Sequence, residues 1–257
     1  MPEAPRITIL TVVRNRVHTI RQALDSVLGQ SYPNIEYVVV DGQSTDGTLK
    51  ILEEYRSRIQ VLVSERDHGL YDAINKGNTL ATGDVVGLLH SDDFYENRDV
   101  VSRVAETFQK TGVDAVYGDL LYVRADNPAT IVRRWISAPY RPRAFYSGWH
   151  PPHTTLFVRK AAIAHWGAYD LQYRIAADYE FMLRLFEVGK ITSAYLPETF
   201  LRMRLGGESN RSLMNILRAN WECYRAFLNN DLRVSPLIML RKPLSKSIQW
   251  YKANRKR

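Results

Sequence analysis

The sequence has little of what marks a secreted or membrane-spanning protein. Its 257 residues include a single cysteine, Cys223, which excludes an intrachain disulfide and a multi-cysteine metal site. We expect this thiol to be a small buried hydrophobe on a helix. No apolar stretch approaches the roughly 20 residues of a spanning helix, and the start MPEAPRITIL lacks the pattern of a signal peptide. A cytoplasmic globular protein is therefore expected.

Acidic residues are missing from the C-terminal segment, and this explains the net charge. Residues 232–257 carry eight Lys and Arg side chains and no Asp or Glu, so they account for the whole formal charge of +8. Residues 1–231 are formally neutral, whereas a nucleic-acid-binding domain needs a basic face. We therefore expect no nucleic-acid partner. A nucleic-acid-binding protein stays a remote alternative that depends on the tail alone.

The basic tail has two interpretations. Leu244, Ile248 and Tyr251 share one face of a predicted helix, with cations on its flanks. Basic amphipathic segments with aromatic side chains suit anionic membrane surfaces. This predicts that residues 236–257 form a helical extension that holds the protein on the inner face of the plasma membrane. The alternative is a solvated charged end, and Pro243 limits any helix to a short one.

Strands alternate with helices over the first hundred residues. Apolar, β-branched runs predict buried strands at residues 7–13, 35–40, 60–64 and 85–89. The alternation is typical of βαβ units, so we predict an α/β fold with a Rossmann-like, mostly parallel central sheet flanked by helices. Beyond residue 97 the pattern is looser: we expect a strand or hairpin at 113–123, mainly loop at 133–152, a short strand at 154–158, helices at 160–166, 176–188 and 213–228, and an extended segment at 193–204.

Two adjacent carboxylates, Asp92 and Asp93, follow the fourth predicted strand. Adjacent acids often lie on solvated turns or cap helices, which is the structural interpretation. Their position favours a site instead, because ligands in open α/β sheets bind outside the carboxyl ends of the strands. A carboxylate pair at that place can hold a divalent cation, Mn²⁺ or Mg²⁺, against a phosphorylated ligand.

Two further loops follow predicted strands. Asp41 ends the second strand too early to cap the next helix, so we predict that it binds a ligand, whereas capping explains Asp46. In the loop after the third strand, Asp67 is also a candidate cap. However, Arg66 and Asp72 crowd the same turn, which is typical of a ligand-facing loop.

In this order, the motifs resemble the inverting family 2 glycosyltransferases, which have a GT-A fold. The resemblance covers residues 6 to about 190 and rests on ITILTVVRN, VVVDGQSTDGT, SERDHGLYDAINKGNTLATGD, LLHSDDFY, VYGD, HTTLFVRK and YRIAADYEFMLRLF. It implies a GT-A domain at 1–231, with a nucleotide-sugar-binding half (6–100), an acceptor-binding half (101–210) and a basic tail (232–257).

The resemblance also implies roles for single residues. Asp178 matches the catalytic base, and Asp93 is the preferred metal ligand. Many members carry a further acid where this chain has His90, which leaves the division of ribose and metal contacts open. The implied donor-binding residues are Thr11, Asn15, Asp41, Arg66, Asp72 and Asp92, and the acceptor-binding candidates are Trp149, His150, His153, Arg204 and Ser209, the last in the turn Gly206-Gly207-Glu208-Ser209.

These residues predict a metal-dependent, inverting transfer of a sugar from a nucleotide-sugar donor. UDP-sugars are favoured by the resemblance, and the predicted acceptor is a hydroxyl of a glycan or polyprenyl-linked glycan in surface polysaccharide or glycolipid biosynthesis. A sugar-phosphate nucleotidyltransferase is the alternative enzyme class. It would show a glycine-rich loop after the first strand, where this chain has Val12-Val13-Arg14-Asn15.

Overall fold

The apolar run near the start of the chain forms strand β1 (Ile7–Val13), and all of its residues are buried. Its side chains alternate between two cores: Leu10 and Val12 belong to one, and Ile7, Ile9 and Val13 to the other. Both faces of the strand are thus covered, which is why its sequence is continuously apolar. This computed structural model describes residues 4–206 and 213–236.

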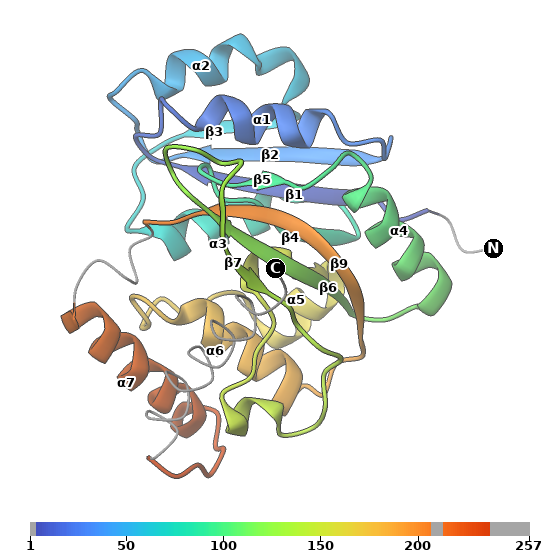
Figure 1. Cartoon of the computed structure of the whole chain (residues 1–257), viewed down its shortest axis with the longest axis vertical. Coiled ribbons are helices and arrows are strands. Elements are labelled where there is room, and N and C mark those ends of the chain that lie inside the picture. Colours follow the sequence, from blue (N-terminus) through green and yellow to red (C-terminus); the bar gives the residue numbers. More distant parts are fainter. Residues whose placement is uncertain (1–3, 207–212, 237–257) are drawn as a thin grey trace.

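Helices lie on both faces of one mixed sheet (Figure 1). The strands within the described residues are β1, β2 (Ile35–Asp41), β3 (Val61–Ser64), β4 (Val85–Leu88), β5 (Phe94–Tyr95), β6 (Ala115–Val123), β7 (Ile131–Trp135), β8 (Phe157–Arg159) and β9 (Ser193–Arg204). The helices there are α1 (Ile20–Leu28), α2 (Thr48–Glu54), α3 (Leu70–Leu80), α4 (Val100–Thr111), α5 (Lys160–Trp166), α6 (Ala177–Leu183), which continues as a π-helical turn (Arg184–Val188), and α7 (Leu213–Asn229), with short 3-10 helices at Arg56–Arg58, Ala144–Ser147 and His153–Thr155.

The strand order is β3-β2-β1-β4-β8-β6-β9-β5, with β7 paired to β6. Strands β1, β2, β3 and β4 run parallel to one another, and Val13 of β1 lies opposite Asp41 of β2. The loops after these strands therefore leave from the same edge of the sheet. The predicted α/β architecture is confirmed, with antiparallel pairing where β8, β5 and β7 join.

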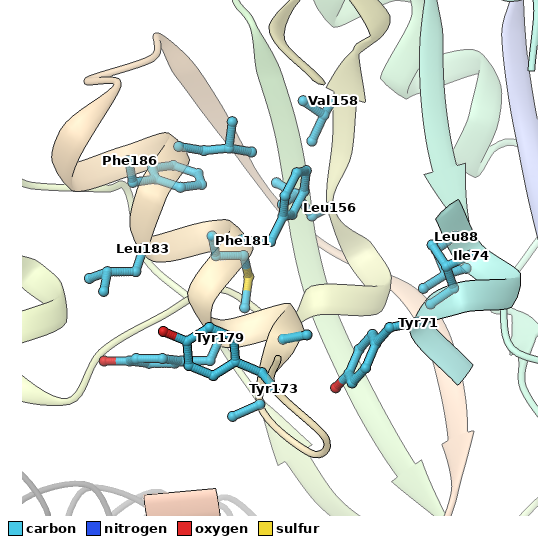
Figure 2. Close-up of a cluster of buried hydrophobic side chains, with 14 of the residues drawn as sticks. Tyr71, Ile74, Leu88, Leu156, Val158, Tyr173, Tyr179, Phe181, Leu183 and Phe186 are labelled. Atoms are coloured by element: carbon cyan, nitrogen blue, oxygen red, sulfur yellow. The ribbon is translucent and has the colours of Figure 1, made fainter. Parts of the chain in front are cut away.

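The core below the sheet joins α3 to α6. Helix α3 lies so close to β1 that a Cβ atom on Gly77 would be 2.1 Å from Leu10 Cδ1. Figure 2 shows Leu156 and Val158 between two groups of this core. The group on the α3 side contains Tyr71, Ile74 and Leu88, and the group on the α6 side contains Phe181, Leu183 and Phe186.

The prediction of mainly loop at residues 133–152 is wrong for its first part. Residues Ile131–Trp135 form β7, which pairs antiparallel with β6. Trp135 stacks on Tyr122 of β6 with ring centroids 6.4 Å apart, and the Arg133 guanidinium lies 5.0 Å from the Tyr122 ring centroid. Cross-strand aromatic and cationic pairs of this kind stabilise a strand whose sequence is not strongly apolar.

The described residues include no helix long and apolar enough to cross a membrane. The predicted basic tail lies outside the described residues from position 237 onward.

Helix α7 packs on α6 and supports its start through one buried acid, Glu222. Glu222 is 4% exposed, and its carboxylate accepts backbone N–H hydrogen bonds from Arg174 (3.2 Å), Ile175 (2.8 Å) and Ala176 (2.9 Å). Backbone N–H groups at the start of a helix have no hydrogen-bond acceptor within the helix. A side chain that is distant in sequence therefore supplies their acceptor.

We expect Glu222→Ala to lower the free energy of unfolding by roughly 2–4 kcal/mol, because it leaves three N–H groups without their acceptor. Urea denaturation measures this change. Glu53→Ala is the control, since Glu53 is an exposed acid on α2, and it should stay within about 0.5 kcal/mol of the parent. Equal stabilities of the two variants would contradict the role of Glu222.

Candidate active site

The loop after β4 carries the two predicted carboxylates in different environments. Asp93 is 1% exposed, its Oδ1 accepts an N–H hydrogen bond from Arg204 (3.2 Å), and its Oδ2 is buried with no hydrogen-bond partner. Burial raises the pKa of Asp93 well above its ordinary value, and the Asp92 charge adds to this effect. The Asp92 side chain is 34% exposed and lies 3.9 Å from the Arg16 guanidinium.

Arg204, at the end of β9, holds this loop in place. Its guanidinium donates hydrogen bonds to the carbonyl oxygen of Asp92 and to the Gln22 side chain, and it lies 5.2 Å from the Phe94 ring centroid. Arg204 was predicted as an acceptor contact. The structure places it beside the carboxylates of the predicted donor side.

The loop after β2 is closed by hydrogen bonds to its own residues. Asp41 is fully buried, and its carboxylate accepts hydrogen bonds from Ser44 N (3.0 Å), Ser44 Oγ (2.5 Å) and Ser64 Oγ (2.6 Å). Asp46 accepts hydrogen bonds from the backbone N–H groups of Thr48 (3.0 Å) and Val17 (3.0 Å). The first of these is an Asx-turn contact to the first residue of α2, whose N-cap residue is Gly47, so Asp46 stabilises the entry to the helix without being its N-cap.

Two predicted donor residues of β1 and its loop also have partners within the protein. Thr11 is fully buried and its hydroxyl lies 3.1 Å from the Tyr37 hydroxyl. Asn15 has a left-handed backbone (φ 53°), and its Oδ1 accepts a hydrogen bond from Thr45 N (2.8 Å). Asn15 thus ties the β1 loop to the β2 loop. Donor binding by these residues stays a prediction.

The loop between β3 and α3, which carries Arg66, lies against the β2 loop, and Asp72 lies in the first turn of α3. Asp67 approaches Gly42 so closely that a Cβ atom on Gly42 would be 2.1 Å from Asp67 Oδ2. Asp72 accepts the backbone N–H of His68 (2.9 Å), which lowers the pKa of Asp72. Lys76 donates to the carbonyl oxygen of Arg66 (2.7 Å) and lies 3.5 Å from Asp72. Three loops thus meet at the edge where ligands bind in this type of sheet.

Asp178, the predicted base, has a partner on each carboxylate oxygen. Tyr71 donates from its hydroxyl to the Ile175 carbonyl (2.7 Å) and to Asp178 Oδ1 (3.2 Å). Burial and the Asp178 charge raise the pKa of Tyr71 well above its ordinary value, so Tyr71 keeps its proton and acts as a donor. His153 Nδ1 lies 3.2 Å from Asp178 Oδ2.

His90 extends this group toward the carboxylate loop. The Nε2 atoms of His90 and His153 lie 3.2 Å apart. Burial lowers the pKa of His90 to about 4, and the neighbouring His153 adds to this effect. Asp178, His153 and His90 thus form a continuous chain from α6 to the loop of Asp92 and Asp93. The Asp178 side chain is 22% exposed, so it remains accessible to a substrate.

The aromatic residues predicted as an acceptor wall are partly used in packing. Trp149 contacts the rings of Tyr117, Tyr140 and Phe145 at centroid distances of 5.9–6.2 Å. His150 contacts Trp135 at 5.1 Å. Both are half-buried, and acceptor binding by them stays a prediction. Ser209 lies outside the described residues.

Asp93 is the residue best suited to a cation. A buried carboxylate oxygen without a partner is costly, and a bound cation would relieve that cost. Within the described residues, no three His, Cys, Asp or Glu side chains converge as a metal site. A cation at Asp93 would therefore need further oxygen ligands from a substrate or from water.

A cavity of about 20 Å³ lies behind Asp178 and His153, lined mostly by apolar side chains and by Asn78. This is the volume of about one water molecule.

Sequence reasoning missed three residues that act on the site through other residues. Tyr71 was placed on a helix without a role, Arg16 received none, and Glu222 was one residue of an amphipathic helix. Glu222 supports the segment before α6 from 46–48 positions away. A lone acid on an amphipathic helix is the signal that could have pointed to it, because buried acids are rare unless they are hydrogen-bonded.

The chain is similar to known proteins in sequence and in fold. The Glycosyl transferase family 2 profile matches residues 8–165. A PGL/p-HBAD biosynthesis glycosyltransferase of Mycobacterium bovis is 32% identical over 197 residues, which is 75% of this chain and 74% of the relative.

Two solved structures share the fold. The S. aureus TarS 1-349 complex with UDP-GlcNAc matches with a TM-score of 0.70 at 17% identity, over 96% of this chain and 79% of that chain. The mannosyltransferase PcManGT from Pyrobaculum calidifontis, in complex with GDP-Man and Mn²⁺, matches with a TM-score of 0.65 at 20% identity, over 94% of this chain and 70% of that chain. These two structures show that the chain has the GT-A fold. Because the family profile covers more than half of the chain, this protein belongs to glycosyltransferase family 2 and is an enzyme.

Proposed function

We propose that the enzyme transfers a sugar from a nucleotide-sugar donor to an acceptor hydroxyl with inversion of the anomeric centre. The observation that supports this proposal is the position of Asp178, whose two carboxylate oxygens each contact a neighbouring side chain and which remains accessible. His153 and His90 connect it to the loop of Asp92 and Asp93. A base on one side and a carboxylate loop on the other are the two groups that a direct displacement requires.

In the proposed reaction, Asp178 takes the proton of the acceptor hydroxyl as the oxygen attacks the anomeric carbon. The bond from that carbon to the diphosphate oxygen breaks, and the nucleoside diphosphate leaves. The new bond forms on the face opposite the leaving group, so the configuration inverts. A divalent cation bound at Asp93 would neutralise the charge that develops on the diphosphate.

A UDP-sugar is the proposed donor, and a glycan or polyprenyl-linked glycan is the proposed acceptor. UDP-GlcNAc and GDP-Man occur in the two similar structures, and the M. bovis relative is named for PGL/p-HBAD biosynthesis. The basic residues of 236–257 would suit an acceptor presented at an anionic membrane surface. Family membership favours transfer over the nucleotidyltransferase and nucleic-acid alternatives.

Asp178→Asn should lower kcat by about 10²–10⁴-fold, because it removes the proton acceptor, and should leave Mn²⁺-dependent binding of UDP unchanged. Asp93→Asn should weaken that binding. A screen of UDP-, GDP- and dTDP-sugars for transfer, with calorimetric titration of UDP with and without Mn²⁺, measures both effects. Asp126→Asn, an exposed acid paired with Arg124, is the control and should change neither. Full activity of Asp178→Asn would exclude it as the base.

The anomeric configuration of the product should be opposite to that of the donor. NMR coupling constants of the transferred sugar in the earliest product measure it. Retention of configuration would contradict a single base with direct displacement.

Asp93→Asn should also stabilise the protein when no divalent cation is present. The folded pKa of Asp93 is raised, so its stabilising contribution is complete below the unfolded value of about 3.9 and is lost as the pH rises through the folded pKa. At pH 7 with EDTA we expect a gain of roughly 1–3 kcal/mol for Asp93→Asn in urea denaturation. A less stable variant under these conditions would contradict this interpretation, and Asp126→Asn should show no gain.

A further inference from the structure

Three side chains from distant parts of the sequence form a hydrogen-bonded chain at the site. Asp178 comes from α6, His153 from the 3-10 helix His153–Thr155, and His90 from the loop after β4. The two links are 3.2 Å each. His153 was expected to contact the acceptor, and the role of His90 was left open, so neither was predicted to act on the base.

The sheet itself fixes the meeting of the two histidines. Strand β4 pairs antiparallel with β8 so that Val85 lies opposite Arg159 and Gly87 opposite Phe157. The loop that follows β4 and the 3-10 helix His153–Thr155 that precedes β8 therefore leave this strand pair at the same end. This strand pairing brings His90 and His153 to the same place, where their Nε2 atoms lie 3.2 Å apart.

The Asp178 carboxylate fixes which group donates in the hydrogen bond between His153 and Asp178. An ionised carboxylate only accepts hydrogen bonds, so His153 must carry its proton on Nδ1 and donate it to Asp178. Nε2 of His153 is then the atom left to face His90. Both links are satisfied at once only when each ring keeps its observed orientation, which restricts the rotation of the His153 ring and of the carboxylate that it holds.

We propose that His153 is a positioning residue for Asp178, that His90 holds His153 in place, and that the chain thereby couples the donor loop to the base. This inference rests on the proposed function. It predicts that a substitution at His90, on the donor side, lowers turnover without weakening donor binding, because its effect reaches the reaction through Asp178.

Two substitutions of His153 separate the links. Asparagine bears its amide nitrogen on Cγ, as histidine bears Nδ1, so His153→Asn keeps a donor for Asp178 and loses the contact with His90. The amide nitrogen of glutamine lies one atom further from the backbone, close to the position of Nε2 in histidine. His153→Gln therefore keeps the contact with His90 and loses the hydrogen bond to Asp178. We expect kcat to fall roughly 10- to 100-fold in His153→Gln, the scale of removing the partner that orients a functional side chain. It should fall less than about 10-fold in His153→Asn.

At His90, glutamine and alanine form the matching pair. A glutamine amide can present its N–H to the lone pair of His153 Nε2, so His90→Gln should retain most of kcat, whereas His90→Ala should lose several-fold. The KM for the donor should stay within about twofold in all four variants. His165→Gln is the control, because His165 is exposed on α5. In an Asp178→Ala background, His153→Gln should cause no further loss, since the pathway for its effect is gone.

The imidazole nitrogens provide a readout that does not depend on activity. ¹⁵N NMR of the full chain should show Nδ1 of His153 protonated, and Asp178→Ala should change that signal. An unprotonated Nδ1, an unchanged kcat in His153→Gln, or a weakened donor KM in His90→Ala with kcat intact would overturn the inference. If the parent enzyme transferred no sugar from any nucleotide-sugar, the proposed function would fail, and the NMR signal would still decide the hydrogen-bonded chain.

Discussion

The parallel pairing of β1 with β2 and β4 is the constraint on which the rest of the site depends. It aligns Val13 with Asp41 and Leu10 with Leu88, so the loops of these strands open at one edge of the sheet. A shift of one residue would turn every side chain of a strand to the opposite face. Both faces of β1 are packed against helices, and the buried cores therefore hold the register that brings the carboxylate loop to this edge.

Three buried acids of this enzyme, Glu222, Asp41 and Asp93, differ in whether both carboxylate oxygens have hydrogen-bond partners. The carboxylates of Glu222 and Asp41 accept hydrogen bonds from the protein and thereby stabilise the segment before α6 and the loop after β2. Asp93 is equally buried but has one oxygen with no partner. A fold that leaves such an oxygen unpaired loses stability, and a ligand that binds there recovers it. Among the buried acids Asp41, Asp93 and Glu222, the unpaired oxygen of Asp93 therefore marks it as the one suited to a cation.

Local patterns predicted the strands well and the contacts between distant residues poorly. The bounds of β1, α5 and β9 follow from apolar runs and spacing, which are local properties. Strand β7 was taken for loop because its Arg and Trp residues are stabilised by Tyr122 across the sheet. The contact of Arg204 with the carboxylate loop, to which β9 delivers it, was not predicted; its acceptor-binding role stays a prediction. These features depend on strand order and register, which no local pattern contains.

The same reasoning explains why the chain of His90, His153 and Asp178 crosses the boundary between the two predicted halves. Residues 6–100 were expected to bind the donor and 101–210 the acceptor, as if each half worked alone. Strand β8 inserts next to β4 in the opposite direction, so the residues that follow β4 meet those that precede β8. In the proposed reaction the loop of Asp92 and Asp93 and the base Asp178 act on the same anomeric carbon, and here two hydrogen bonds through His153 and His90 join them. The antiparallel pairing that interrupts the parallel sheet is therefore the structural element that brings residues of the two predicted halves together.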